Sequence, residues 1–164
     1  MRKSKSVGVL FVCLGNICRS PTAHGVFESM VASRGLGERI RVDSCGTGDW
    51  HIGQPPDRRA AAEAARRGYG LDHLRARQVE SRDFERFEYI LAMDHQNLAD
   101  LKAMRPAAFT GYLGLFLSFA PELAVEEVPD PYYGGEAGFA HVLDMVEKAS
   151  EGLLQEICGA DTTC

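Results

Sequence analysis

The stretch Val-Gly-Val-Leu-Phe-Val-Cys-Leu-Gly-Asn-Ile-Cys-Arg-Ser-Pro, residues 7–21, is the most informative part of the sequence. Residues 7–12 form a nearly continuous apolar run, which is typical of a parallel strand buried on both faces. Ser20 is a favourable N-cap residue and Pro21 suits the first position of a helix, so we expect a helix over residues 21–34. The stretch therefore predicts a buried strand, a short loop and a helix in direct succession.

The rest of the chain continues this alternation of strands and helices. We expect further strands at residues 39–45, 89–93 and 113–119, and further helices at residues 56–67, 95–104 and 136–157. Such alternation predicts an α/β fold, a small doubly wound parallel sheet with helices on both faces. Ligands of such sheets bind beyond the carboxyl ends of the strands, where Cys13 stands. The length of 164 residues fits a single domain, residues 1–164.

Composition and charge narrow the classes of function. The formal net charge of −5 argues against general attraction to nucleic acid or to anionic membranes. No apolar run is long enough to cross a bilayer or to form a signal peptide, so we expect a cytoplasmic protein without a membrane partner. The five cysteines are odd in number and two share one short loop, which favours catalysis or redox chemistry over structural bridging. No His/Cys spacing indicates a zinc site.

The loop between the first strand and the first helix has the features of an anion site. Its backbone N–H groups can point inward and meet the positive end of the helix dipole. Gly15 and Asn16 tolerate the left-handed backbone conformation that a tight cradle requires. The loop lacks the Gly-Lys-Ser/Thr ending of a nucleotide P-loop, so NTP hydrolysis is not expected.

Cys13 and Arg19 supply the reactive groups of this loop. A helix N-terminus and a nearby arginine favour the thiolate form of a cysteine, which makes Cys13 a candidate nucleophile. The planar fork of Arg19 matches two phosphate oxygens and would stabilise the equatorial oxygens during phosphoryl transfer. The Cys-x5-Arg spacing lets the chain circle one phosphate. We expect Ser20 to donate its hydroxyl to the thiolate and so ease its departure from phosphorus.

A phosphocysteine mechanism also needs an acid to protonate the leaving group. Pro-Asp-Pro-Tyr-Tyr-Gly-Gly occupies residues 129–135. Pro131 restricts Asp130 to extended geometry, and a rigidly held carboxylate beside aromatic side chains suits a general acid that later acts as the base for water. An ordinary Asp-Pro turn is the alternative interpretation of this segment.

The two motifs together closely resemble the low-molecular-weight protein tyrosine phosphatases. Further matches are Asp43–Thr47, Trp50–His51, Gly53–Asp57, Ala76–Val79 and Tyr89–Asp94. The resemblance covers nearly the whole chain in order. It implies a four-stranded parallel sheet flanked by helices, the phosphotyrosine protein phosphatase I-like and flavodoxin-like architecture, with no metal and no cofactor.

The resemblance also implies an activity and a set of roles. The chain is expected to hydrolyse phosphotyrosine in proteins and release inorganic phosphate, with Cys13 as nucleophile, Arg19 as phosphate clamp and Asp130 as general acid and base. The residues expected to bind substrate are Leu14, Gly15, Asn16, Ile17, Cys18, Ser20, Trp50, Tyr132 and Tyr133. Ser44 is expected to support the loop by hydrogen bonds. In this family Cys18 can form a reversible disulfide with Cys13 that protects the nucleophile from oxidation.

One departure from the family pattern concerns a histidine. Many members carry His directly before the Lys/Arg-Ala-Arg-Gln run, where it supports the loop asparagine. In this sequence Leu74 precedes that run, at residues 75–78, and His73 stands one residue earlier. Either a local backbone shift brings His73 to the loop or this support is absent, so His73 is given no role.

Other activities compete with tyrosine phosphatase activity. Arsenate reductases of the same fold need further cysteines, and residues 80–97 contain none. Arginine phosphatases of this fold tend to carry Thr at the position of Ile17, whose apolar side chain favours an aromatic substrate. A non-catalytic thiol redox or phosphate-binding module would need Cys13 and Cys18 but not Asp130.

Two groups of residues on the predicted helices are expected to lie at the surface. His24, His95 and His141 are expected on helix surfaces rather than as ligands. Arg58, Arg59, Arg66 and Arg67 form a basic helix face. Such a face is most often solvated, and the alternative is that it steers acidic phosphopeptides.

Overall fold

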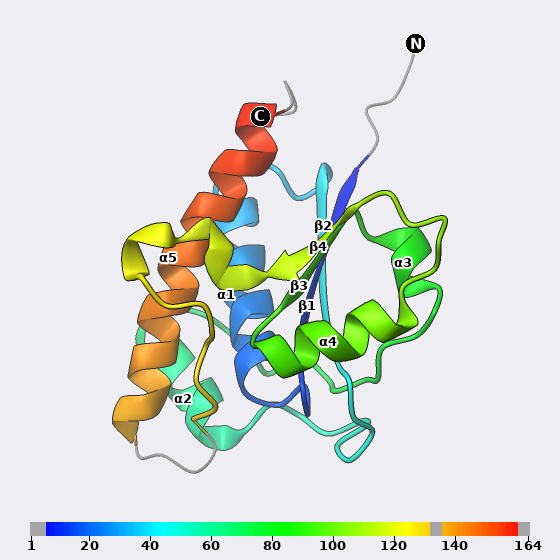
Figure 1. The fold of residues 1–164 in the computed structure, drawn as a ribbon. Helices are drawn as coiled ribbons and strands as arrows, with labels where there is room; N and C mark the ends of the chain where they lie inside the picture. The colour runs from blue at the N-terminus through cyan, green and yellow to red at the C-terminus, as the bar shows by residue number, and fades with distance from the viewer. Residues whose placement is uncertain (1–5, 132–135, 161–164) are drawn as a thin grey trace.

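The computed structural model describes residues 6–131 and 136–160 of the chain (Figure 1). At the centre of this described part is a four-stranded parallel sheet with the strand order β2-β1-β3-β4. Its strands are β1 (Val7–Cys13), β2 (Ile40–Gly46), β3 (Tyr89–Ala92) and β4 (Tyr112–Leu115). The winding reverses at β1, because β2 pairs with one side of it and β3 with the other. The doubly wound α/β fold expected from the sequence is confirmed.

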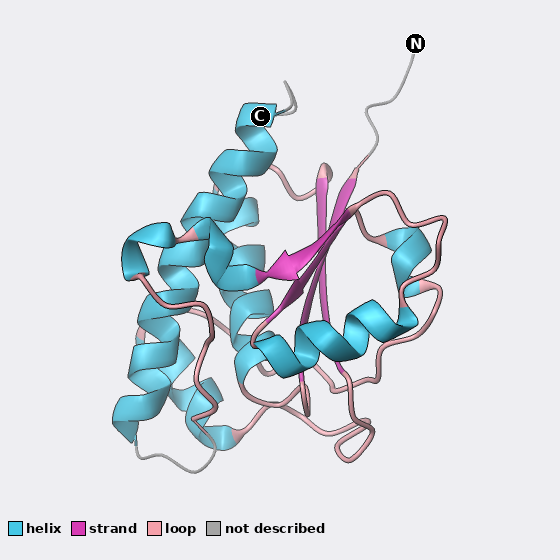
Figure 2. Cartoon of the chain, in the orientation of Figure 1, coloured by secondary structure: helices cyan, strands magenta, loops and turns pink. Residues whose placement is uncertain are grey.

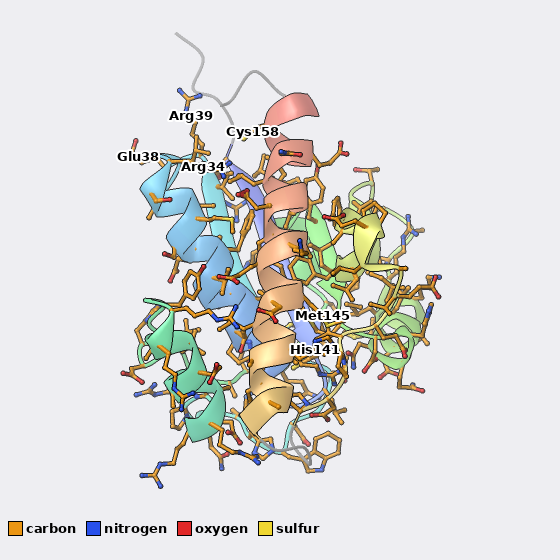
Figure 3. All side chains as sticks on the ribbon, turned by 90° about the vertical axis from the view of Figure 1, so that its left-hand side faces the viewer. Arg34, Glu38, Arg39, His141, Met145 and Cys158 are labelled. Carbon is orange, nitrogen blue, oxygen red and sulfur yellow. The ribbon has the colours of Figure 1, made fainter. Side chains whose placement is uncertain are left out.

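Helices cover both faces of the sheet (Figure 2). On one face lie α1 (Arg19–Ser33) and α5 (Glu136–Ala160), with α2 (Arg58–Arg66) packed beside them. On the other face lie α3 (Asp83–Arg86) and α4 (His95–Met104). The long helix α5 packs beside α1 on the same face of the sheet (Figure 3). None of the helices in the described part of the chain is long and apolar enough to cross a membrane.

The continuous apolar run of β1 divides between two hydrophobic cores. Val9 and Phe11 belong to the core formed with α1 and α5, whereas Leu10 and Val12 belong to the core formed with α3 and α4. Successive side chains of a strand point to opposite faces, so both sets must be apolar when helices cover both faces. All four side chains are completely buried. This double burial fixes the position of Cys13, the last residue of the strand.

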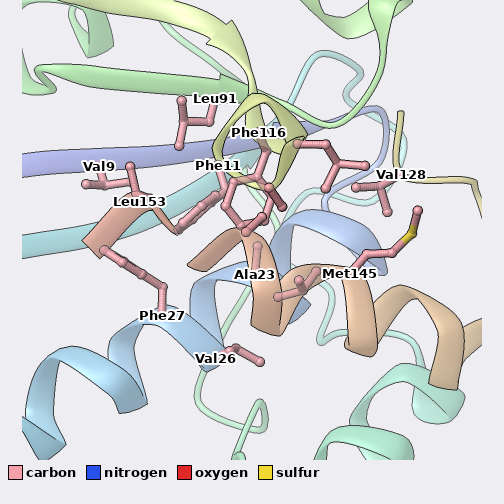
Figure 4. Close-up of a cluster of buried hydrophobic side chains, with 14 of the residues drawn as sticks. Val9, Phe11, Ala23, Val26, Phe27, Leu91, Phe116, Val128, Met145 and Leu153 are labelled. Atoms are coloured by element: carbon pink, nitrogen blue, oxygen red, sulfur yellow. The ribbon is translucent and has the colours of Figure 1, made fainter. Parts of the chain in front are cut away.

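Phe11 is the centre of the larger core (Figure 4). Its ring packs edge-to-face against Phe27 of α1, with 5.7 Å between ring centroids, and against Phe116, with 5.0 Å. Edge-to-face pairs of this kind add to the stabilisation that burial of the rings provides. The core therefore holds β1, α1 and the segment after β4 in one rigid arrangement beneath the loop between β1 and α1.

Two sequence predictions need correction, and one element was missed. The predicted strand 113–119 ends at Leu115 and continues as a 3₁₀ helix, Phe116–Phe119, which turns Phe116 and Leu117 into the core beside α5. The helix predicted to start at Pro21 starts at Arg19, and its N-cap is Cys18 rather than Ser20. The short helix α3 was not predicted at all.

Candidate active site

The backbone of the loop between β1 and α1 is held from both sides. Asn16 adopts the left-handed conformation expected for it, with φ of 56°, and is only 3% exposed. Its side-chain Oδ1 accepts a hydrogen bond from the backbone N–H of Arg77, at 3.0 Å, and its Nδ2 donates to Ser20 Oγ, at 2.8 Å. On the outer side Gly46, the last residue of β2, lies so close that an added Cβ would be 2.6 Å from the carbonyl oxygen of Leu14.

The sulfur of Cys13 lies at the base of this loop and is almost completely buried. Ser20 Oγ lies 3.0 Å from it, and the backbone N–H of Asn16 donates to it at 3.3 Å. Ser20 is inside the first turn of α1, and its hydroxyl also bonds to Asn16 and to the carbonyl oxygen of Cys45. These bonds explain why Ser20 does not cap the helix. The sulfur thus lies beside the N-terminus of α1, the positive end of the helix dipole.

Arg19 is buried beside Cys13, at 4% exposed. Its Nη1 donates to Asp94 Oδ2 at 2.7 Å and to the carbonyl oxygen of Val128 at 3.0 Å. Burial opposes the charged form, but the charge of Cys13 and the hydrogen bond to Asp94 outweigh it and raise the pKa of Arg19 above its ordinary value. Within the described residues Nε and Nη2 donate no hydrogen bond. The guanidinium is thus anchored by one nitrogen and keeps its other donors for a ligand.

A cavity of about 240 Å³ opens above the sulfur. It is lined by Cys13, Leu14, Gly15, Ile17, Cys18, Arg19, Trp50, His51 and Asp130. Trp50 stands at the rim with 67% of its surface exposed, while Asp130 reaches the same cavity from the loop before α5. Among the described residues no group of three or more His, Cys, Asp or Glu side chains could hold a metal ion. The cavity brings together a thiol, a guanidinium and a carboxyl group.

Cys18 lies in the wall of the cavity and differs from Cys13 in its surroundings. Burial, reinforced by the charge of Asp57, raises the pKa of the Cys18 thiol to about 12. Cys18 therefore stays protonated at neutral pH. Cys13, Cys18 and the fully buried Cys45 are all free thiols in this structure.

The family follows from comparison with known proteins. The family model described as low molecular weight phosphotyrosine protein phosphatase matches residues 8–161. The chain belongs to this family. A protein of Streptomyces coelicolor named low molecular weight protein-tyrosine-phosphatase is 45% identical over 152 residues, which cover 91% of this chain and 92% of that protein.

Solved structures resemble this low molecular weight phosphatase family member over its whole fold. A crystal structure of a protein tyrosine phosphatase from Entamoeba histolytica is 41% identical, with a TM-score of 0.90, and covers 94% of this chain and 99% of that chain. The Drosophila arginine phosphatase DARP is 33% identical, with a TM-score of 0.86, and the match covers 93% of this chain and 99% of that chain. The same fold is thus found in structures named for two different phosphorylated residues.

Most of the site residues that the sequence predicts for this family member lie in or against the cavity. Asn16 and Ser20 do not line the cavity, but the hydrogen bond between their side chains holds the loop in place. The other predicted loop residues line the cavity together with Trp50. Tyr132 and Tyr133 lie outside the described residues.

Ser44 and His24 differ from expectation. Ser44 Oγ lies 2.9 Å from Nδ1 of His24 and has no hydrogen bond to the loop among the described residues. His24 is buried at 6% exposed rather than on the surface, and its Nε2 lies 3.5 Å from a carboxylate oxygen of Glu28. The hydrogen bond to His24, followed by that to His73, lowers the pKa of Glu28 to about 2 although burial opposes this shift. Ser44 therefore ties β2 to α1 rather than to the loop between β1 and α1.

His73 does not support the loop asparagine in this family member. Its Nε2 lies 2.8 Å from Glu28 Oε1, and the side chain is exposed. The backbone N–H of Arg77 takes the place of a histidine as the partner of Asn16 Oδ1. The Arg77 side chain bonds to Asp43 and to the completely buried Asp83, which fixes this backbone segment.

Sequence reasoning missed three residues that contribute to the site. Asp94 anchors Arg19, Arg77 positions Asn16, and His51 lines the cavity beside Gly15. The sequence pattern could have indicated Asp94, because an Asp directly after a buried strand and before a helix is a strong N-cap candidate. Its Oδ1 does accept a hydrogen bond from the backbone N–H of Asn97.

Proposed function

We propose that this chain is a protein tyrosine phosphatase that hydrolyses phosphotyrosine through a covalent phosphocysteine on Cys13. The observation that carries the proposal is one small cavity lined by Cys13, Arg19 and Asp130, with the sulfur at the N-terminus of a helix. Family membership supports the reaction class. Phosphotyrosine-containing proteins are then the substrates and inorganic phosphate is the product.

In the first step Cys13 Sγ attacks phosphorus as the bond from phosphorus to the tyrosine oxygen breaks. Asp130 gives its proton to the departing phenolate, so tyrosine leaves as a neutral phenol. The fork of Arg19 and the N–H groups of the loop hold the equatorial oxygens while charge redistributes over them. The anchor on Nη1 supports this role, because a guanidinium that is already fixed loses little freedom when it binds the transition state.

In the second step water attacks the phosphorus of the phosphocysteine. The Asp130 carboxylate takes a proton from this water, the sulfur–phosphorus bond breaks, and Cys13 leaves as a thiolate. Ser20, with its oxygen 3.0 Å from the sulfur, can donate a hydrogen bond to that thiolate as it forms. Phosphate then departs, and the protonated Asp130 is ready for the next cycle.

The walls of the cavity favour an aromatic substrate. Leu14, Ile17 and Trp50 are apolar, and Leu14 and Trp50 stand exposed at the opening. A flat phenyl ring gains burial from such walls, whereas a guanidinium group would lose hydration against these three apolar side chains. Phosphoarginine is the second candidate substrate, because the fold closely matches that of the Drosophila arginine phosphatase.

The test of the proposed substrate compares two peptides that differ only in the phosphorylated residue. We expect kcat/KM for the phosphotyrosine peptide to exceed that for the phosphoarginine peptide by at least about tenfold, since one mismatched group in a pocket costs about 1–3 kcal/mol. Phosphate release over time measures both rates. If the phosphoarginine peptide were hydrolysed faster, phosphoarginine and not phosphotyrosine would be the substrate.

Asp130→Asn tests the acid in the same assay. We expect the turnover of the phosphotyrosine peptide to fall about 10²- to 10³-fold, because the variant cannot protonate the phenolate. Turnover of p-nitrophenyl phosphate should fall less, since p-nitrophenolate leaves without help. Glu122→Gln makes the same change at an exposed carboxylate outside the cavity and should leave both rates unchanged. Equal losses for the two substrates would contradict the acid role.

Gly46→Ala tests whether the loop must keep its present course. The added methyl group would lie 2.6 Å from the carbonyl oxygen of Leu14 and 3.2 Å from the backbone nitrogen of Asn16, so the loop must shift. We expect kcat/KM for p-nitrophenyl phosphate to fall at least about tenfold, because small displacements of reacting groups are costly. Gly37→Ala, where nothing lies within 4 Å, is the matched control. A Gly46→Ala protein as active as the Gly37→Ala protein would show that loop position does not limit turnover.

A further inference from the structure

A second hollow lies between α2 and the first turns of α5, which pack side by side (Figure 3). Its volume is about 330 Å³. It is lined by Arg58, Arg59, Ala62, Glu63, Arg66 and Phe139. Four of the lining residues, Arg59, Ala62, Glu63 and Arg66, are spaced three or four positions apart along α2, so they share one face of the helix. We refer to this hollow as the α2 groove.

The α2 groove is joined to the catalytic loop. The backbone N–H of Asp57, the N-cap of α2, donates to the carbonyl oxygen of Ile17 at 2.7 Å. Phe139, which lines the groove, packs in one buried cluster with Cys18, and Ile17 packs against this cluster. Ile17 and Cys18 also line the active-site cavity, so the cavity and the groove lie on opposite sides of one thin wall.

The α2 groove is positively charged on a protein whose net charge is −5. Arg59 is fixed over the ring of Phe139, with its Cζ 4.8 Å from the ring centroid. Arg66 lies 3.0 Å from Glu63 and keeps 62% of its side chain exposed. Arg58 is exposed and has no ion-pair partner within residues 6–131 and 136–160. Arg59 is paired with Asp57 at 3.1 Å and Arg66 with Glu63 at 3.0 Å, so the excess of positive charge at the groove comes from Arg58.

The neighbouring Arg67 shows what a purely structural arginine does at this helix. Its Nη1 lies 2.8 Å from Asp144 and 2.7 Å from Glu147, and both of these carboxylates belong to α5. Arg67 therefore holds the two helices together with its charge neutralised. Arg58 makes no such pair, so the packing of α2 on α5 does not account for its charge.

We infer that the α2 groove binds acidic side chains that flank the phosphotyrosine of a protein substrate, an inference that rests on the proposed function. Arg58 and Arg66 lie about 12 Å apart along the axis of α2, a distance that an extended peptide covers in about four residues. Arg58 directly follows Asp57, whose backbone N–H bonds to Ile17 of the loop, so a carboxylate close to the phosphotyrosine can meet Arg58 while the phosphate occupies the loop. Phe139 and Ala62 contact the aliphatic part of the acidic side chain.

Synthetic phosphotyrosine peptides test this inference. In a series that carries Glu or Ala at each of the four positions on either side of the phosphotyrosine, we expect Glu on one side to raise kcat/KM about three- to tenfold, mainly through KM. The Arg58→Glu/Arg66→Glu variant should lose this advantage and should prefer Lys at the same positions. Raising the ionic strength should weaken both preferences, since the charges are exposed.

Two controls separate this inference from its premises. Turnover of p-nitrophenyl phosphate, which has no flanking residues, should be the same for the variant and the wild type within about twofold. Arg82→Glu/Arg86→Glu makes the same change of net charge at exposed residues distant from the groove and should leave the peptide preference intact. If Arg58→Glu/Arg66→Glu hydrolysed the peptides with an unaltered preference for Glu, this inference would be wrong and the proposed function would stand. A wild-type protein that hydrolyses none of the substrates would overturn the proposed function as well.

Discussion

Cys13→Ser is expected to abolish turnover while the protein still folds and binds phosphate. A serine hydroxyl is not ionised at neutral pH and is a much poorer leaving group from phosphorus than a thiolate, so both chemical steps fail. We expect kcat for p-nitrophenyl phosphate to fall at least about 10⁵-fold, as it does when the nucleophile of other covalent enzymes is removed. Calorimetric titration with inorganic phosphate should give binding within about tenfold of the wild type, because the loop N–H groups and Arg19 remain.

Cys45→Ala is the matched control for this variant. Cys45 is completely buried, pairs with Val12 across the sheet, and has a pKa raised well above its ordinary value by burial, so it takes no part in the reaction. Its loss should lower the stability slightly and leave kcat within a few-fold of the wild type. Acid quench of the wild type during turnover should trap phosphate on Cys13. Detectable turnover by Cys13→Ser at more than about 1% of the wild-type rate would exclude the proposed nucleophile.

Arg19→Lys is expected to cause the second-largest loss of p-nitrophenyl phosphate turnover. Lysine keeps the positive charge but not the planar fork, so it cannot hold two equatorial oxygens and the Asp94 carboxylate at once. We expect kcat to fall about 10²- to 10³-fold, the range seen when one preorganised donor is removed from a transition state. Steady-state kinetics with p-nitrophenyl phosphate measure this loss.

Two further variants show whether the loss arises from the fork itself. Arg41→Lys makes the same replacement at an exposed residue of β2, far from the cavity, and should have no effect on kcat. Asp94→Asn keeps the fork but weakens its anchor, so we expect an intermediate loss. If Arg19→Lys were as active as Arg41→Lys, Arg19 would not bind the transferring phosphoryl group.

The sequence was most informative where neighbouring residues act together. The strand 7–12, the left-handed Asn16 and the placement of Cys13 at a helix N-terminus all follow from local patterns, and the structure confirms them. The presence of Asp130 in the same cavity as Cys13 depended on the family resemblance, because nothing in the local pattern of residues 129–131 states where that loop will lie.

The errors arose where tertiary contacts override local preference. Ser20 is a good N-cap by type, but its hydroxyl is engaged by Cys13 and Asn16, so the helix starts earlier. Residues 116–119 are apolar enough for a strand, yet their burial beside α5 bends them into a 3₁₀ helix. His24 looked like a surface residue of a helix, and only the packing of α1 on β2 shows that it is buried.

One carboxylate, that of Asp94, is shared by two parts of the molecule. Its Oδ2 holds Arg19 of α1, while its Oδ1 accepts the backbone N–H of Asn97 and so starts α4, a helix on the opposite face of the sheet. Any fraying of that helix start would loosen the guanidinium, and an anion that tightens the guanidinium would in turn stabilise the helix start. Occupancy of the loop and local order on the far face are therefore linked in both directions, as thermodynamic reciprocity requires.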